Sequence, residues 1–225
     1  MESFELARAT SPELRTGATL LVPLGSTEQH GPHLPLDTDT RIAAAIATRA
    51  AARCPGVMVA PALPYGSSGE HQSFAGTLSI GTEVLVSVLV ELTRSAAHGF
   101  GHLVFVNGHG GNHEAVIAAA SQLNDEGHAL STWWPRAPGG DAHAGVTETS
   151  LMLAIDPDVV RLELAEAGNT APLAELIEPM RTGGVAAVSA NGVLGDPAGA
   201  SPDAGARLLE ALVADLVDHI AALAV

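Results

Sequence analysis

The run LGSTEQHGPHLPLDTD, residues 24–39, packs carboxylates and imidazoles into one short loop directly after an apolar segment, residues 19–24. Glu28 and His30 stand two residues apart, so in extended backbone both side chains leave the same face. Asp39 follows at the start of a segment with helical period. Carboxylates and imidazoles together suit Zn, Fe or Mn. The loop therefore predicts the first half of a metal site in a hydrolase.

Short β-rich runs alternate along the chain with longer runs of helical period. Strands are predicted at residues 19–24, 57–60 and 103–106, with a weaker one at 129–133. Helices are predicted at residues 40–53, 82–97, 112–126, 147–155 and 203–223. This alternation predicts right-handed βαβ crossovers and a parallel sheet covered by helices on both faces. Ligands of such sheets bind beyond the carboxyl ends of the strands.

The composition predicts one globular domain over residues 1–225. A chain of 225 residues is long enough for one sizeable core, and 47% of it is hydrophobic while only 16% is charged. We find no repeat, linker or low-complexity tract. The net charge of −15 argues against a nucleic acid or an anionic membrane as partner.

The sequence favours a cytoplasmic protein. Residues 1–10 carry charges and lack the apolar core of a signal peptide. The most apolar run, residues 84–90, is too short to span a bilayer. Cys54 is the single cysteine, so an internal disulfide framework and a cysteine-based zinc ribbon are excluded.

Several covalent strategies of catalysis are absent from the chain. It contains no lysine, which removes the Walker-type phosphate loop, the pyridoxal phosphate Schiff base and a lysine general base. No GxSxG nucleophile motif occurs. Because ten histidines are present, metal-assisted chemistry gains weight by elimination.

A second cluster is the glycine-rich turn NGHGGN, residues 107–112, which follows the predicted strand 103–106. Glycines allow the backbone to approach a ligand closely, and the turn presents His109 at the same sheet edge as Glu28 and His30. The alternatives are a phosphate cradle or a simple turn between a strand and a helix. The shared edge favours the metal site.

A third cluster is GGDAHAGVTET, residues 139–149, with His143 in a loop and Glu148 at the start of the next helix. A carboxylate at that position interacts favourably with a helix N-terminus. Glu148 could equally be an ordinary member of that first turn, so this segment alone is a weak signal.

Together the three clusters offer two imidazoles and three carboxylates for metal. The candidate ligands are Glu28, His30, Asp39, His109 and Glu148. This number suits two divalent ions that share one bridging carboxylate, and such a pair can activate water and stabilise a tetrahedral intermediate. His143 is then free to move a proton to the leaving amine.

The sequence gives weaker evidence for a role of the other histidines and of the aromatic residues in the site. His33, His71 and His113 lie close to the motifs and could line the pocket. Trp133 and Trp134 could form a pocket wall, but packing in the core or between subunits explains them equally well.

Four ordered segments together resemble the creatininase (creatinine amidohydrolase) family, and they extend over nearly the whole chain. They are GSTEQHGPHLPLDTDT, GSSGEHQSFAGTLSIG, NGHGGN and DAHAGVTETS. The resemblance implies a three-layer α/β/α sandwich with a mostly parallel central sheet. It also implies a dinuclear metal site, hydrolysis of C–N amide bonds and a homo-oligomer, often a hexamer.

The resemblance also implies roles for individual residues. By position, four residues match metal ligands of the family: Glu28, His30, Asp39 and His109. Asp39 matches the bridging ligand, and His143 matches the catalytic histidine. The expected cofactors are two divalent ions, Zn or Fe, with Mn a further option.

Two departures argue against creatinine as the substrate. Creatinine hydrolases carry a glutamate two residues after the histidine of the NGH turn, where this chain has Gly111, so we assign the missing ligand to Glu148. Those enzymes also place a tryptophan shortly before the catalytic histidine, and the matching residues here are 138–140, Pro-Gly-Gly. The more open pocket suits a flexible peptide tail that enters C-terminus first. Residues 167–173 and 180–197 are most similar to peptide-cleaving members of the family.

Three alternatives stay open at this point. The nearest is another amidohydrolase of the same family that acts on creatinine or on a small formamide. A non-catalytic metal-binding scaffold is a second, disfavoured by the complete ligand set and the spare histidine. A nucleotide-binding module that uses the GHGGN turn is a third, disfavoured by the absence of GxGxxG and of lysine.

Overall fold

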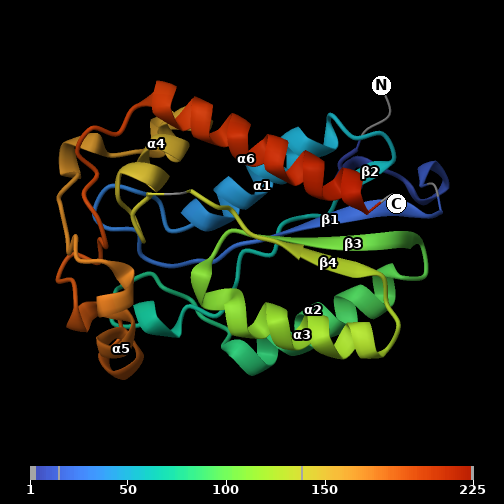
Figure 1. Ribbon diagram of the computed structural model, residues 1–225, viewed down its shortest axis with the longest axis horizontal. Helices are drawn as coiled ribbons and strands as arrows, with labels where there is room; N and C mark the ends of the chain where they lie inside the picture. The colour runs from blue at the N-terminus through green and yellow to red at the C-terminus, as the bar shows by residue number, and fades with distance from the viewer. Residues whose placement is uncertain (1–3, 15, 138, 224–225) are drawn as a thin grey trace.

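The computed structural model describes residues 4–14, 16–137 and 139–223, so Pro138 lies outside the described residues (Figure 1). Four strands form one parallel sheet in the order β2-β1-β3-β4. They are β1 (Ala18–Leu24), β2 (Val57–Val59), β3 (Phe100–Asn107) and β4 (Leu130–Trp133). The predicted parallel sheet is confirmed.

The helices follow the predicted pattern with one addition. The five predicted helices are α1 (Thr38–Ala51), α2 (Thr82–Ala96), α3 (His113–Asp125), α4 (Val146–Ile155) and α6 (Pro202–Ala222). The sequence did not predict α5 (Leu173–Gly183), which contains Pro179 and therefore lacks a clean helical signature. None of the helices in the described part of the chain has the length and apolar character that a bilayer crossing requires.

Two helical layers cover the sheet, with α1, α4 and α6 on one face and α2 and α3 on the other (Figure 1). Successive strand residues supply the two cores in turn. Leu21 and Val104 pack into the first core, and Leu20 and Phe105 into the second. Each fully buried side chain of this kind contributes roughly 1.5–3 kcal/mol. The predicted α/β/α layering is confirmed.

The carboxyl ends of the strands bring loops from distant parts of the sequence together. Leu24 at the end of β1 pairs with Asn107 at the end of β3, so the loops that follow start side by side. The second of these loops also lies against α1. A Cβ on Gly108 would stand 2.6 Å from the carbonyl oxygen of Asp39, so only glycine fits there.

Candidate metal centre

The loop after β1 folds back on itself and buries its polar side chains. The Glu28 N–H donates to the Leu36 carbonyl at 2.9 Å, which closes the loop. Glu28 and His30 are fully buried, and Asp39 lies in the first turn of α1. The Asp39 carboxylate lies 3.0 Å from His30 Nε2 through Oδ1 and accepts a hydrogen bond from Ser26 Oγ at 2.8 Å through Oδ2.

The loop after β3 places His109 between the two carboxylates of the first loop. His109 Nδ1 lies 3.0 Å from Asp39 Oδ2, and Nε2 lies 3.1 Å from Glu28 Oε2. The turn is held in place by the Asn112 amide, which donates to Asn107 Oδ1 and to the Gly25 carbonyl. Asp39 therefore contacts both His30 and His109, the position that a bridging ligand would take.

The segment after β4 brings His143 and Glu148 to the same place. His143 pairs through its backbone with Leu194, and its ring centroid lies 4.3 Å from that of His30. Ala144 then turns the chain with φ of +53°, a conformation that costs a non-glycine residue some strain. Its N–H donates to Glu148 Oε2 at 2.6 Å, and the same oxygen lies 3.9 Å from His30 Nε2. All six predicted site residues thus gather at one sheet edge.

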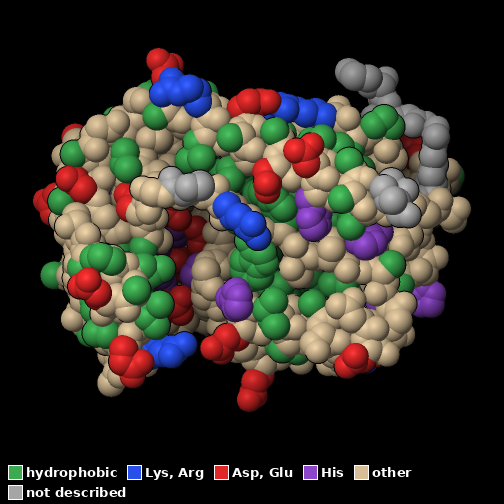
Figure 2. All heavy atoms as spheres, in the orientation of Figure 1, with side chains coloured by type: hydrophobic (Ala, Val, Ile, Leu, Met, Phe, Trp, Pro, Cys, Tyr) green, Lys and Arg blue, Asp and Glu red, His purple; other side chains and the backbone are tan. Residues whose placement is uncertain are grey.

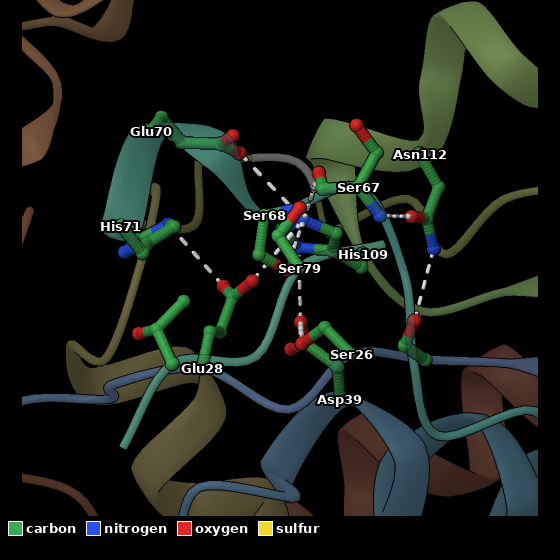
Figure 3. Close-up of polar contacts among 12 residues, drawn as sticks. Ser26, Glu28, Asp39, Ser67, Ser68, Glu70, His71, Ser79, His109 and Asn112 are labelled. Atoms are coloured by element: carbon green, nitrogen blue, oxygen red, sulfur yellow. Dashed lines mark hydrogen bonds and ion pairs between the residues drawn. The ribbon is translucent and has the colours of Figure 1, made fainter. Parts of the chain in front are cut away.

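The loop after β2 supplies two further polar side chains, as Figure 3 shows. His71 Nε2 lies 3.2 Å from Glu28 Oε1, and the His71 ring stands 4.5 Å from that of His143. Glu70 Oε1 lies 3.6 Å from His109 Nε2. Sequence reasoning gave His71 only a weak claim and missed Glu70. The available signals were the polar, glycine-containing character of the segment between the second strand and the second helix, and its match to the family resemblance.

The other candidates lie outside this cluster. The His33 ring is buried and lies 2.8 Å from Thr149 Oγ1, while His113 packs against Trp134 at 5.1 Å between ring centroids. Trp133 donates through Nε1 to Asp215 of α6 at 2.6 Å. The Trp133 side chain therefore ties the sheet to a helix.

Position 111 must be a glycine because the loop that carries Glu70 packs directly against it. A Cβ at this position would lie 2.4 Å from Glu70 Oε1, from His109 Nε2 and from the Ser67 carbonyl oxygen. The Glu70 carboxylate therefore fills the space into which a side chain at position 111 would project. The Glu70 side chain, which comes from the loop after β2, therefore places its carboxylate on the side of His109 where a side chain at position 111 would lie.

Burial and mutual attraction shift the ionisation of the cluster. Burial raises the pKa of Glu28 and that of Glu148, each to about 7. Burial also opposes the charge of His30 and His109, but the neighbouring carboxylates outweigh it and raise the pKa of each ring to about 10. In the metal-free protein these two rings hold protons at neutral pH and neutralise the buried carboxylates.

The donor set fits divalent metal ions. Both oxygens of Glu28 are buried and accept no hydrogen bond, although ionised carboxylates normally do. Three groups of side chains within the described residues place their ligand atoms close enough to hold an ion. They are Glu28, Asp39 and His109; His30, His143 and Glu148; and Glu28, His71 and His143. Carboxylate and imidazole donors in this mixture suit first-row divalent cations.

One face of the molecule is hollowed. Figure 2 shows a hollow left of centre with acidic and histidine side chains inside it. A cavity of about 450 Å³ is lined in part by Gly139, Gly140 and Ala142, which precede His143 in the sequence.

The sequence model of the creatininase family, described as creatinine amidohydrolase, matches residues 7–220. The chain belongs to the creatininase family. The predicted amide-bond hydrolase is thereby confirmed at the level of reaction type.

Relatives within the creatininase family include two with different names. The chain is 54% identical to the mycofactocin precursor peptide peptidase of Mycobacterium ulcerans (strain Agy99), over 96% of this chain and 90% of that protein. It is 32% identical to the creatinine amidohydrolase of Pseudomonas putida, over 89% of this chain and 88% of that protein.

Solved structures of creatininases share the fold, and the names of two of them include a metal. A structure named "Creatininase Mn" is 28% identical with a TM-score of 0.80, over 97% of each chain. A variant described as "Zn-Zn type" is 25% identical with a TM-score of 0.77, also over 97% of each chain. A divalent metal centre in this member of the creatininase family agrees with both.

Metal affinity should rise with pH. In the metal-free protein, His30 and His109 hold protons up to a pKa of about 10, and a ligating ring must lose its proton. Each displaced proton changes affinity by about tenfold per pH unit, so the two rings alone give about 100-fold per pH unit. Protons lost from Glu28 and Glu148, whose pKa values are about 7, make the rise steeper below pH 7. Competition with a fluorescent chelator between pH 6 and 8 measures this slope. An affinity that falls or stays level as pH rises would contradict the assignment.

The substitution Gly111→Ala should disturb the centre. The added methyl group would meet Ser67, Glu70 and His109, so we expect a loss of about 1–3 kcal/mol in unfolding free energy. Metal affinity should fall as well. Gly110→Ala is the matched control, because a Cβ at Gly110 meets no atom within 4 Å. Urea unfolding and metal titration of both variants provide the measurement, and equal behaviour would rule out the packing argument.

Proposed function

We propose that this chain is a metal-dependent peptidase that acts on the mycofactocin precursor peptide and removes its modified C-terminal Val-Tyr unit. The observation that carries the proposal is the 54% identity over 96% of the chain to a peptidase of that name. The gathering of all six candidate site residues at one sheet edge supports it.

In this proposal the cluster would hold two divalent ions, Zn or Fe with Mn as a further option, and Asp39 would contribute to both. Glu28, Asp39 and His109 would hold one ion. His30, Asp39 and Glu148 would hold the other, since His30 Nε2 lies 3.0 Å from Asp39 Oδ1 and 3.9 Å from Glu148 Oε2. When bound, the ions supply an activated water and stabilise negative charge on the scissile carbonyl oxygen. Glu28 and Asp39 are held in place for this role because both carboxylates are buried, Glu28 in the loop after β1 and Asp39 in the first turn of α1.

His143 is the proposed catalytic residue. Its Nε2 lies 2.8 Å from the Gln29 carbonyl oxygen and donates to it, so Nδ1 is left free, and Nδ1 lies 3.8 Å from Glu28 Oε1. Burial, and after it the positive charge of His30, hold the pKa of His143 well below its usual value. The neutral ring can therefore take a proton from the attacking water and pass it to the departing amine.

The rim next to His143 favours an extended peptide over a small ring. Gly139 and Gly140 contribute no bulky side chain to the cavity before His143. A flexible tail could enter C-terminus first and bring its scissile bond to the cluster.

We further propose that the protein forms a homo-oligomer, and specifically a hexamer. Large apolar side chains are exposed on loops around the site, among them Leu36, Leu78, Leu162 and Leu164. A second copy of the chain would cover such side chains. The cytoplasmic location and the absence of nucleic-acid and membrane partners stay predictions.

The test is mass spectrometry of a maturase-treated precursor peptide incubated with the protein. We expect release of the modified Val-Tyr fragment, its loss after treatment with EDTA, and its recovery when Fe or Zn is added. An intact peptide in the presence of bound metal would refute the substrate while leaving the metal centre in place.

A small-amide hydrolase is the second candidate function, favoured by the 32% identity to a creatinine amidohydrolase. Creatinine is therefore incubated with the protein in parallel. Turnover of creatinine without cleavage of the peptide would replace the first proposal by the second.

The variant His143→Ala should retain metal and lose about 10²- to 10⁴-fold in turnover, because proton transfer to the leaving amine is removed. His98→Ala is the control, since His98 is exposed and precedes β3 at the opposite edge of the sheet. Peptide cleavage and metal content are measured for both. Full turnover of His143→Ala would remove this residue from the mechanism.

The variant Glu148→Gln should bind metal more weakly. Loss of a direct ligand should exceed the about 10- to 100-fold cost of losing an outer hydrogen-bond partner. Glu114→Gln is the control, because Glu114 also lies in the first turn of a helix but is exposed. If elemental analysis after dialysis gives equal metal content for the two variants, Glu148 is not a ligand.

A further inference from the structure

Gln29 stands between the two candidate ligands Glu28 and His30 and reaches the two histidines that lie beside them. Its side chain is only 5% exposed. Its Nε2 lies 2.8 Å from His71 Nδ1, 3.1 Å from His143 Nε2 and 3.1 Å from the Gly192 carbonyl oxygen. One amide group thus contacts both histidine rings that belong to the third candidate metal group.

The orientation of this amide is fixed by a backbone donor. The Gly31 N–H donates to Gln29 Oε1 at 2.8 Å, so the oxygen faces Gly31 and the NH₂ group faces the histidines. The space around the Gln29 amide is also narrow on the side of Gly192. A Cβ on Gly192 would lie 2.0 Å from Gln29 Oε1, and Gly192 has φ of +82°, so only glycine leaves room for the amide.

The two amide protons have two acceptors that fit. His143 Nε2 lies 2.8 Å from the backbone carbonyl oxygen of Gln29, so this nitrogen must carry a proton and cannot also accept one from the amide. The amide therefore donates to His71 Nδ1 and to the Gly192 carbonyl. Every polar atom of the Gln29 side chain is then satisfied.

This network decides the tautomer of His71. A neutral histidine that accepts at Nδ1 carries its proton on Nε2. His71 Nε2 lies 3.2 Å from Glu28 Oε1, without the alignment of a hydrogen bond but close enough for its proton to favour the carboxylate, whereas the other tautomer would set a nitrogen lone pair near that oxygen. With Nε2 protonated and Nδ1 occupied by Gln29, His71 has no lone pair left for a metal ion.

We propose that Gln29 is a positioning residue that fixes His71 as the Nε2–H tautomer, so that His71 supports the Glu28 carboxylate instead of binding metal. Of the three candidate groups, that of Glu28, His71 and His143 is then not a metal site. Glu28 keeps Oε2 for the group it forms with Asp39 and His109. The assignment of the tautomer is independent of the proposed function, and only the supporting role toward Glu28 rests on it.

The test uses the whole metal-free protein with ¹⁵N-labelled histidine. Long-range ¹H–¹⁵N spectra report which ring nitrogen carries the proton, and the His71 signals are assigned by their loss in His71→Gln. We expect a protonated Nε2 and an unprotonated Nδ1 in the native protein. A protonated Nδ1 at His71 would overturn the proposal without any variant.

Gln29→Glu provides the second arm of this test. The carboxylate has nearly the same shape, can still accept from Gly31, but offers His71 Nδ1 an acceptor in place of a donor. We expect the proton at His71 to appear on Nδ1. Gln72→Glu is the matched control, because it adds the same charge next to His71 at an exposed side chain and should leave the His71 signals unchanged.

Gln29→Met covers the case in which Gln29→Glu does not fold. Without any donor at position 29, His71 should populate both tautomers and its two ring nitrogen shifts should move toward each other. A His71 spectrum that is identical in the native protein and in the folded Gln29 variants would refute the positioning role. Because no turnover is measured, this result stands apart from success or failure of peptide cleavage.

Discussion

The two carboxylates of Glu28 and Asp39 are buried together where the parallel strands end, and the surrounding structure neutralises them. Two negative charges removed from water cost several kcal/mol each unless cations accompany them. In the metal-free protein, protons on His30 and His109 provide that compensation, as the pKa of about 10 for each ring indicates. Divalent ions would do so more effectively, and the loops around the cluster hold the donors ready for them.

The sheet makes this cluster possible because each strand ends at the same edge. Four loops, after β1, β2, β3 and β4, each deliver at least one polar side chain to it, and Figure 3 shows the contributions of the first three loops. At two positions a glycine allows these loops to pack closely against neighbouring backbone, which fixes their relative placement. Gly108 lies against the backbone of Asp39, and Gly111 lies against the backbone of Ser67. A side chain at either glycine would force apart loops whose relative placement sets the ligand positions.

Much of this arrangement was accessible from the sequence. The periodicity predicted the four strands and five helices, and the parallel topology then placed Glu28, His30 and His109 at one edge. His143 was reached through the family resemblance, because its own segment is a weak signal. The positions of Glu70 and His71 were not accessible, because their loop is placed by tertiary hydrogen bonds such as Ser67 N–H to Asn112 Oδ1. Helix α5 was missed because its internal proline and its glycine neighbours mask the helical pattern.

The central claim is that Asp39 joins two metal ions, and diffraction from crystals grown with Zn²⁺ tests it most directly. Anomalous difference maps at the zinc edge should contain two peaks, one on each side of the Asp39 carboxylate. The first should lie between Glu28 and His109, and the second between His30 and Glu148. A peak among Glu28, His71 and His143, or no peak next to Asp39, would contradict the account.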